Sequence, residues 1–552
     1  MAGMALAQSH LDSYETPNQQ CWQRSYDEGV DWDWRPAEDR PEGLFAEEHE
    51  EDWVDLQEWI SQVSLMMWRR RRGLSWERLP DFFRPSSHLR PEARAAAPWL
   101  TGRTLHPHIV PAATYFSGPY QPQVNVDFWG SRSATDMDKG ICDEMREGFS
   151  NGGSVAHIHL CMHHDSFMRD HWEAGVGILD GDVRDGYLQN HGTVPYLPCQ
   201  SPPKGVVDQV TKQRGISNLS HPKGKVVEGA QVAINGRVDL ESQPPMNLSS
   251  GRAYGRNVGV MTTASQSAKT LQVKRDAKGA YRQMHIIGRD FCMSLAATEH
   301  GVLVDVRVCF GGRLYPLSFQ RAELVVVRVA AARMAAFDRL HPPAELYARE
   351  WLADRVLRLG ADQATLFALL QYLDDSLLTS LNDLLVELGV RRGECHAYIL
   401  DATMEEAGIA MAGGAKRVES EGAVEGLGIE ACPLTWEAYY PADKAARLKL
   451  FIQAILDEGA TLAAVSRPAV QALIGKEKWV AGVAPQVNPL LASGYRLINA
   501  ACPLEHVPVS DAFIRDQQKI LEIIDSDPRV PLVPKATFPS IALPSGSLAR
   551  RM

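Results

Sequence analysis

The stretch that decides the fold is ATLFALLQYLDDSLLT, residues 364–379, in which apolar residues stand on both sides of the acidic pair Asp374-Asp375. Two apolar runs around a short polar break are typical of a strand–turn–strand unit. A buried helix with a capping aspartate fits the same letters. We expect the first alternative, a β-hairpin that carries both aspartates at its tip.

A third carboxylate, Asp276 in VKRDAKGAYRQM, also lies beside an apolar run. Moving an ionised carboxylate out of water costs free energy unless a positive charge offsets it, and adjacent carboxylates repel each other. Divalent metal provides that charge: two Mg²⁺ ions about 3.5 to 4 Å apart can support the attack of a 3′-hydroxyl on a nucleotide phosphate, and Mn²⁺ may substitute for them. Asp276, Asp374 and Asp375 are therefore candidate metal ligands and catalytic residues, but an isolated YxDD is a weak signal, so the neighbouring segments have to decide.

Segments on both sides of the hairpin agree with one family in order and spacing. They are, in chain order, QRGISNLSHPKG (213–224), DAKGAYRQ (276–283), FGGRLYPLSFQR (310–321), YLDD (372–375), GAK (414–416), GLGIE (426–430) and VQALIGKEKW (470–479). Together they resemble the retroelement reverse transcriptases, and most closely those of DIRS-type (tyrosine-recombinase) retrotransposons. The resemblance covers about 145–510, and it is specific because seven weak motifs fall in one order.

This resemblance implies an α+β fold of the right-hand polymerase type, with fingers, a helical thumb, and a palm built on a βαββαβ-like antiparallel sheet with helices on one face. Weak periodicity, many prolines and clustered charges predict an acidic, Trp- and Pro-rich leader over 1–120 that is largely disordered. After it the resemblance implies a lead-in to the fingers over 121–200, fingers and palm over 201–435, a thumb over 436–505, and a tail over 506–552. Because the family normally continues into an RNase H domain, the resemblance implies that this domain is either missing here or cut short within the tail.

The resemblance also implies roles for individual residues. RNA-directed DNA synthesis needs a template–primer of RNA or DNA and deoxynucleoside triphosphates. Nucleotide contacts are expected at Lys212, Arg214, Lys278, Tyr281, Gly311 and Lys416, with Tyr281 as the steric gate that excludes a 2′-hydroxyl. Primer and template contacts are expected at Tyr372, Leu427, Gly428, Gly475, Lys476 and Lys478.

Some positions depart from the family pattern. Asn218 stands where aspartate is usual, Gly426 where an aromatic residue is usual, and Gly215 where a large apolar residue is usual. None of these changes removes a metal ligand, but together they support an alternative. In that alternative the chain is a degenerate or captured relative, without catalytic activity, that binds nucleic acid or a partner.

Local patterns also predict three helices, the last of which leads into the motif at 470–479. One covers Ala322–Leu340, a second opens at Pro441-Ala442-Asp443 and ends before Gly459, and a third opens at Ser466-Arg467-Pro468.

Composition narrows the protein class. The chain has 552 residues, 45% of them hydrophobic, which is enough for several domains, and a formal charge of -11, which is unusual for a protein that tracks phosphates. Its nine cysteines form no CxxC pair, and the histidines and cysteine between His157 and His171 fit no closed zinc pattern. We find no membrane span and no signal peptide, so an intracellular location is expected, and the oligomeric state is left open.

Overall fold

The computed structural model describes residues 124–532 apart from 151–158, 161–162, 165–166, 168–169, 191–199, 209–212, 228–229, 239–247, 266–268, 299–300, 361–363 and 500–505. The predicted leader, 1–120, lies outside the described residues, as does the end of the predicted tail, 533–552. The chain divides into two compact units: 1–246 with 279–322 and 407–409, and 247–278 with 323–406 and 410–552.

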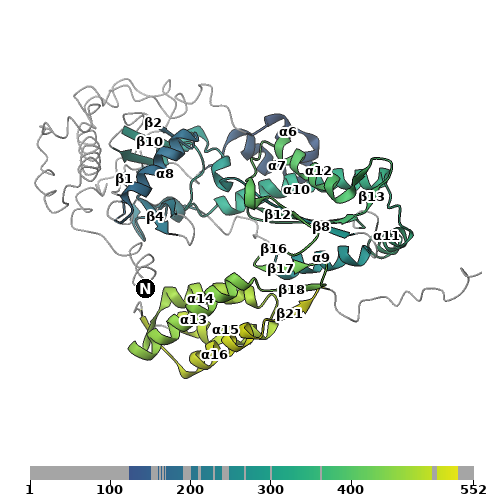
Figure 1. The fold of residues 1–552 in the computed structure, drawn as a ribbon. Coiled ribbons are helices and arrows are strands. Elements are labelled where there is room, and N and C mark those ends of the chain that lie inside the picture. Colours follow the sequence, from purple (N-terminus) through teal and green to yellow (C-terminus); the bar gives the residue numbers. More distant parts are fainter. Residues whose placement is uncertain are drawn as a thin grey trace, which may run out of the picture. The chain divides into compact units, whose positions relative to one another are not determined.

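Three helices open the described part of the first unit (Figure 1). They are α6 (Val126–Gly130), α7 (Arg132–Glu147) and α8 (Trp172–Arg184). Asn125 and Ser131 cap the first two by accepting backbone N–H groups, as short polar side chains do at helix starts. Trp129 anchors this end, since its buried indole donates a hydrogen bond of 2.9 Å to the carbonyl of Ala407.

The strands of the first unit pair mostly in antiparallel fashion. The largest sheet has the order β2 (Leu188–Asn190), β10 (Gly301–Asp305), β9 (Leu295–Thr298). A separate hairpin joins β4 (Lys204–Asp208) to β5 (Gln213–Ser217), and α8 packs on both of these strands and on β2. Two further pairs of short strands are β1 (His159–Leu160) with β3 (Gln200–Ser201), and β6 (Val226–Val227) with β7 (Ala230–Gln231). The unit also contains the 3-10 turns η6 (Ile234–Gly236), η7 (Ala280–Gln283) and η8 (Gly288–Met293).

The second unit contains a four-stranded antiparallel sheet in the order β11-β12-β8-β15. Its elements follow the chain order β8 (Lys269–Asp276), α10 (Tyr315–Leu340), α11 (Leu346–Leu359), β11 (Phe367–Tyr372), β12 (Asp375–Asn382), α12 (Arg392–Glu406), β15 (Val418–Ser420), and α10 belongs to this unit from Glu323 onward. This is a βαββαβ arrangement, and the mixed, antiparallel architecture agrees with the predicted α+β class. The hairpin predicted over 364–379 is confirmed, whereas α10 begins at Tyr315, before the predicted start at Ala322.

Helices cover both faces of this sheet (Figure 1). On one face lies α12. Its Asp401 accepts a hydrogen bond from Arg275 of β8, and its His396 is hydrogen-bonded to Ser380 of β12. On the other face lies α9 (Gly251–Ala264), whose Tyr254 hydroxyl donates a hydrogen bond of 2.7 Å to Gln272. Arg275 and Gln272 point to opposite faces of β8, because successive side chains of a strand alternate between its faces. The expectation of helices on one face of the sheet is therefore wrong, since α9 covers the second face.

A second antiparallel sheet and a group of helices complete this unit. The sheet order is β16 (Val424–Gly426), β17 (Ile429–Cys432), β18 (Glu437–Tyr439), β21 (Arg529–Pro531). The helices are α13 (Ala442–Leu462), α14 (Arg467–Val480), α15 (Leu491–Ile498) and α16 (Asp511–Asp525). The 3-10 turn η10 (Pro485–Leu490) lies between α14 and α15. The short strands β19 (Ala464–Ser466) and β20 (His506–Pro508), which precede α14 and α16, pair with each other. The pair β13 (Leu384–Leu385) and β14 (Val390–Arg391) precedes α12.

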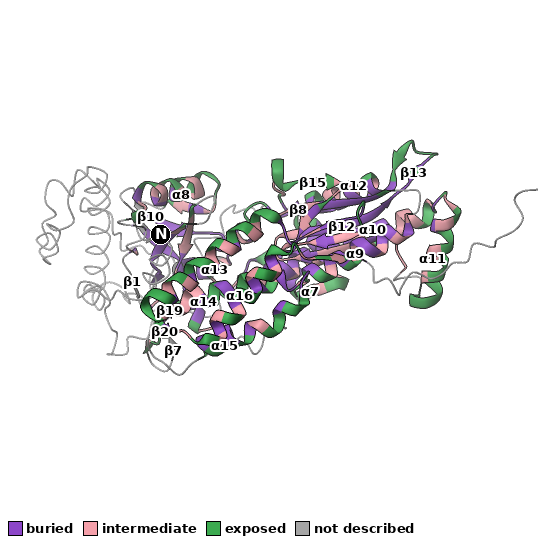
Figure 2. Cartoon of the chain, turned by 60° about the horizontal axis from the view of Figure 1, so that its bottom comes forward, coloured by how far each residue is buried: buried purple, intermediate pink, exposed green. Residues whose placement is uncertain are grey.

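The helices of this group share one apolar core, and their buried stripes are visible in Figure 2. Leu448, Ile452 and Ile455 form the stripe of α13, at the spacing of one helix face. The predicted end before Gly459 is wrong, because α13 continues to Leu462 and uses Gly459 for close packing: a Cβ there would stand 3.0 Å from a methyl group of Val509. In the described part of the chain, no helix is both long enough and apolar enough to cross a membrane.

Candidate functional site

The turn of the hairpin between β11 and β12 has two residues, Leu373 and Asp374. Leu373 takes a left-handed conformation with φ 54°, as two-residue hairpins often require at this position. Asp375 is therefore the first residue of β12, where it pairs with Tyr372 on one side and with Asp276 of β8 on the other. The backbone N–H of Ala277 donates to the carbonyl of Asp374 at 2.8 Å. The structure thus brings Asp276 and Asp375 together as cross-strand neighbours, with Asp374 in the adjoining turn.

Two lysines lie against these carboxylates. The Lys416 ammonium is 2.5 Å from Oδ1 of Asp276, and the Lys274 ammonium is 3.6 Å from Oδ2 of Asp375. Burial raises the pKa of the Asp375 carboxyl, Lys274 acts against this effect, and the negative charges of Asp374 and Asp276 raise that pKa further. Mutual repulsion of this kind is what a bound cation relieves.

The donor set suits a hard divalent cation. Carboxylate oxygens are the ligands that Mg²⁺ prefers, and Oδ1 of Asp375 is buried without a hydrogen-bond partner among the described residues. Within the same residues, no group of three or more histidine, cysteine, aspartate or glutamate side chains converges as a metal cluster. Asp276 and Asp375 therefore fit such a cation as a pair, and the ammonium groups of Lys416 and Lys274 already offset part of their negative charge.

The segment 410–416 runs beside the end of β8 and carries Lys416. Its carbonyl at Ala410 accepts from the N–H of Lys278 at 2.8 Å, and its N–H at Ala412 donates to the carbonyl of Asp276 at 2.7 Å. Lys416 ends the short turn η9 (Gly414–Lys416), and its side chain is 53% exposed. Lys278 is exposed as well. The backbone bonds explain how Lys416, 140 residues from Asp276, reaches that carboxylate.

Three residues predicted to contact the nucleotide meet around Phe310 in the first unit. The Arg214 guanidinium, on β5, lies over the Phe310 ring at 5.4 Å from its centroid, and the Tyr281 ring, in η7, lies 5.4 Å from the same centroid. Gly311 has φ 122°, and a Cβ there would stand 2.0 Å from the carbonyl oxygen of Ser217, so only glycine fits. Lys212, another of the six predicted nucleotide contacts, lies outside the described residues.

The residues predicted to contact primer and template belong to the second unit. The turn between β16 and β17 holds Leu427 at φ 50° and Gly428 at φ 79°, and a Cβ on Gly428 would stand 2.4 Å from the Trp479 ring. The same ring lies 6.2 Å from that of Tyr372. Tyr372, Leu427 and Gly428 are therefore joined through Trp479 of α14, a residue that sequence reasoning gave no role.

The other predicted contacts lie on the exposed side of α14. The Lys476 ammonium is 5.3 Å from the centre of the Phe451 ring, and that of Lys478 is 5.4 Å from the centre of the Tyr495 ring. Gly475 is exposed, with open space where a Cβ would stand.

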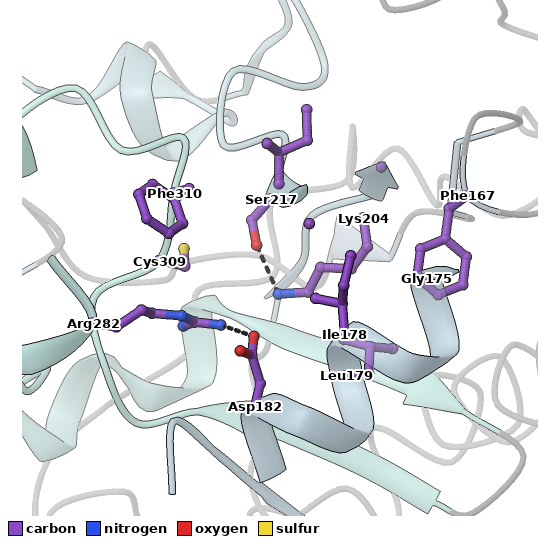
Figure 3. Close-up of a pocket in the computed structure, with 13 residues that line it drawn as sticks. Phe167, Gly175, Ile178, Leu179, Asp182, Lys204, Ser217, Arg282, Cys309 and Phe310 are labelled. Carbon is purple, nitrogen blue, oxygen red and sulfur yellow. Dashed lines mark hydrogen bonds and ion pairs between the residues drawn. The ribbon is translucent and has the colours of Figure 1, made fainter. Parts of the chain in front are cut away.

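The first unit also contains a buried ionic network that sequence reasoning missed. Figure 3 shows part of it around a small pocket, where Lys204 points to Ser217 and Arg282 to Asp182. Asp305, which is fully buried, binds Lys204 at 2.5 Å and Arg282 at 2.7 Å. Burial favours a higher pKa for Asp305, yet the two cations hold that pKa below its ordinary value. Lys204 and Asp305 are 101 residues apart, so no local sequence signal could reveal the pair.

The histidines considered for zinc have separate partners where they are described. His163 Nδ1 accepts from the backbone N–H of Lys204, His164 pairs with Asn218 at 3.0 Å, and His171 pairs with Asp208 at 3.0 Å. The side chains of His157, His159 and Cys161 lie outside the described residues.

No family model matches this sequence, and no curated protein matches it. Among solved structures, the foamy viral protease-reverse transcriptase "dRH" in complex with double-stranded DNA has a TM-score of 0.41 and 12% identity, covering 68% of this chain and 50% of that chain. The foamy viral protease-reverse transcriptase with double-stranded DNA has a TM-score of 0.40 and 14% identity, covering 68% and 60%. Its structure with an RNA/DNA hybrid has a TM-score of 0.40 and 12% identity, covering 72% and 46%. This chain thus spans between 46% and 60% of the length of these three structures.

Proposed function

We propose that this chain is the reverse transcriptase domain of a retrotransposon, an RNA-directed DNA polymerase that adds deoxynucleotides to the 3′-hydroxyl of a primer. The observation that carries the proposal is the register of β8 and β12, which sets Asp276 beside Asp375 with Asp374 in the adjoining turn. The order of the sequence motifs supports the retroelement origin and its DIRS type. The palm would be the four-stranded sheet, the thumb the group of helices α13 to α16, and the fingers would lie in the first unit.

In this proposal Asp276, Asp374 and Asp375 hold two Mg²⁺ ions, or Mn²⁺ in their place. When bound, such ions stabilise the charge that develops on the attacking and leaving oxygens. Lys416, which pairs with Asp276, would hydrogen-bond a phosphate oxygen and give a proton to the leaving pyrophosphate.

The remaining nucleotide contacts follow from side-chain chemistry. Arg214, with Lys212 and Lys278, would donate charge-assisted hydrogen bonds to the triphosphate. Tyr281 would place its ring under the sugar, where a 2′-hydroxyl would clash. Gly311 would let the backbone approach the nucleotide closely.

Primer and template would lie along α14. Lys476 and Lys478 would contact phosphates, and Gly475 would allow the helix to approach the wide minor groove of an A-like hybrid. Tyr372 and the turn at Leu427-Gly428 would contact the primer end. The open space at Gly475 and the exposure of both lysines support this part of the proposal.

The test is extension of a labelled DNA primer on RNA and DNA templates with Mg²⁺ or Mn²⁺ and the four deoxynucleotides. Asp374→Asn should abolish extension, because it removes a ligand charge while keeping the size of the side chain. Asp354→Asn is the matched control, since Asp354 lies on α11 with a half-exposed side chain paired to Arg358. Folded wild-type protein that extends no primer under any of these conditions would refute the polymerase proposal.

A second candidate is a relative without catalytic activity that binds nucleic acid or a partner. The ion pairs of Lys416 and Lys274 favour it, because they offset the carboxylate charges without a metal ion. This candidate predicts that primer–template binds equally to wild type and to Asp374→Asn while neither protein extends it.

A further inference from the structure

Glu323 is a glutamate inside the core of the second unit. It lies on α10 with no exposed surface, and its carboxyl group makes two hydrogen bonds. One oxygen is 2.7 Å from the hydroxyl of Ser376, and the other is 3.1 Å from the amide nitrogen of Gln371. Because a buried polar group is stable only when it is paired, both bonds hold their partners in place.

The two partners face each other across the hairpin. Gln371 on β11 pairs in register with Ser376 on β12, and the next pair toward the turn is Tyr372 with Asp375. Glu323 therefore binds both strands one residue pair away from the first aspartate.

Gln371 extends this contact into the turn. Its amide nitrogen also donates to the carbonyl of Leu373 at 2.6 Å, and Leu373 is the residue in the left-handed conformation. On the other side of the turn, Ala277 of β8 binds the carbonyl of Asp374. The turn is thus held from α10 through Gln371 and from β8 through Ala277.

The charge state of Glu323 suits this arrangement. Burial raises the pKa of its carboxyl to about 8, the bonds to Ser376 and Gln371 act in the opposite direction, and Asp374 and Asp375 raise that pKa further. Near pH 7 the group is therefore mostly neutral. In the structure its carboxyl oxygens accept one hydrogen bond from the Ser376 hydroxyl and one from the Gln371 amide. A glutamine at this position keeps both bonds, because its oxygen accepts from Gln371 and its amide donates to the Ser376 hydroxyl, which can also accept.

We propose that Glu323 is a positioning residue for the carboxylate hairpin: by binding Gln371 and Ser376 together it fixes Asp374 and Asp375 against Asp276 and so sets the affinity of the site for a divalent cation. This inference rests on one part of the proposed function, namely that the three aspartates bind such a cation.

The test measures Mn²⁺ binding to the full chain by electron paramagnetic resonance of the free ion, without nucleic acid. Glu323→Gln should bind Mn²⁺ within about twofold of wild type, because both hydrogen bonds survive. Glu323→Leu, which keeps the volume and removes the bonds, should weaken binding by roughly tenfold, and Ser376→Ala, which removes one bond, by roughly threefold. Ser376→Ala deletes a single hydroxyl, so it serves if Glu323→Leu does not fold.

Glu477→Leu is the matched control. Glu477 is also a fully buried glutamate of the second unit, on α14, and its removal should leave Mn²⁺ affinity unchanged. Melting temperatures of all variants show which of them are folded. A folded Glu323→Leu or Ser376→Ala with wild-type affinity would overturn the inference, as would a Glu323→Gln that binds as weakly as Glu323→Leu.

Failure of this inference can be told apart from failure of the proposed function. Asp374→Asn should abolish specific Mn²⁺ binding, and a wild type that lacks such binding overturns the inference as well. Mn²⁺ binding that follows the expected order of variants, in a protein that extends no primer, supports the role of Glu323 and refutes only the polymerase. Primer extension in Mg²⁺ whose rate falls in the same order of variants supports both the role of Glu323 and the polymerase.

Discussion

Tyr281 packs against two aromatic neighbours of its own unit, at 5.4 Å from the Phe310 ring and 5.9 Å from the Phe319 ring. If its ring excludes a 2′-hydroxyl, Tyr281→Ala should raise the incorporation of ribonucleotides relative to deoxynucleotides by at least about tenfold, as the loss of a steric clash allows. Single-nucleotide extension with both sugar types measures this ratio. Tyr281→Phe, which keeps the ring and its packing, is the control, and a ratio unchanged in Tyr281→Ala would remove the gate from the proposal.

Lys416 stands where a cation bound to Asp276 would be expected. Because the two positive charges compete for one carboxylate, Lys416→Gln should tighten Mn²⁺ binding, by no more than about fivefold since a half-exposed ion pair contributes roughly 0–1 kcal/mol. The neighbouring Arg417 is equally exposed but pairs with Asp401, so Arg417→Gln is the matched control. Equal Mn²⁺ affinity of Lys416→Gln and wild type would contradict the competition.

Glu477 on α14 makes the stability of the helical part depend on pH. Burial raises its pKa to about 8 from an ordinary value of 4.5. Between these values the folded state holds a proton that the unfolded state has lost, so stability falls as pH rises through this window, by up to about 1.4 kcal/mol per pH unit. Below 4.5 and above about 8 the two states bind the same number of protons at this group, and the effect stops.

The expected result is a smaller loss of melting temperature between pH 5 and pH 8 in Glu477→Gln than in wild type. Melting of both proteins at half-unit pH intervals measures it. The comparison isolates Glu477, because Glu323 and all other titrating groups are common to both proteins. Parallel curves for the two proteins would show that Glu477 does not carry the proton in the folded state.

The buried network of the first unit joins strands, a helix and a turn that are distant in sequence. Asp305→Asn leaves Lys204 and Arg282 in the core without their shared counter-charge, and such a loss costs about 3–5 kcal/mol. We expect a clear drop in the melting temperature of the full chain. Asp136→Asn, which breaks an exposed pair with Arg132, should leave the melting temperature nearly unchanged. Equal melting of the two variants would mean that the network adds nothing.

At the scale of the whole molecule, the formal charge of -11 opposes binding to a phosphate backbone. Much of the negative charge lies in the acidic stretch 27–59, outside the described residues. Deleting 27–59 should tighten binding to labelled primer–template at low salt, and the gain should disappear as salt screens the repulsion over about 10 Å at 0.1 M. Fluorescence anisotropy over a salt series measures this, with deletion of the nearly neutral 1–26 as control. Equal affinities at low salt would show that the leader does not repel nucleic acid.

Some features of this protein follow from the sequence alone, because their causes are local. The apolar runs around Asp374-Asp375 predict the hairpin, since strand and turn preferences act over a few neighbouring residues. Pro441 and Ser466-Arg467-Pro468 mark the starts of α13 and α14 for the same reason. The end of α13 was predicted wrongly, because packing against Val509 outweighs the local preference of Gly459 for a helix terminus.

Other features were decided only by the tertiary structure. The register of β8 and β12, over eight residue pairs, sets Asp276 beside Asp375, although the sequence identifies both residues. Glu323 lies 48 residues from Gln371, and Lys204 lies 101 residues from Asp305. Contacts between such distant residues produce no local sequence pattern from which they could be predicted. The sequence by itself determined which carboxylates form the candidate site and which local elements carry them. The fold decided which buried groups hold them, because the burial and pairing of a charge depend on every element packed around it.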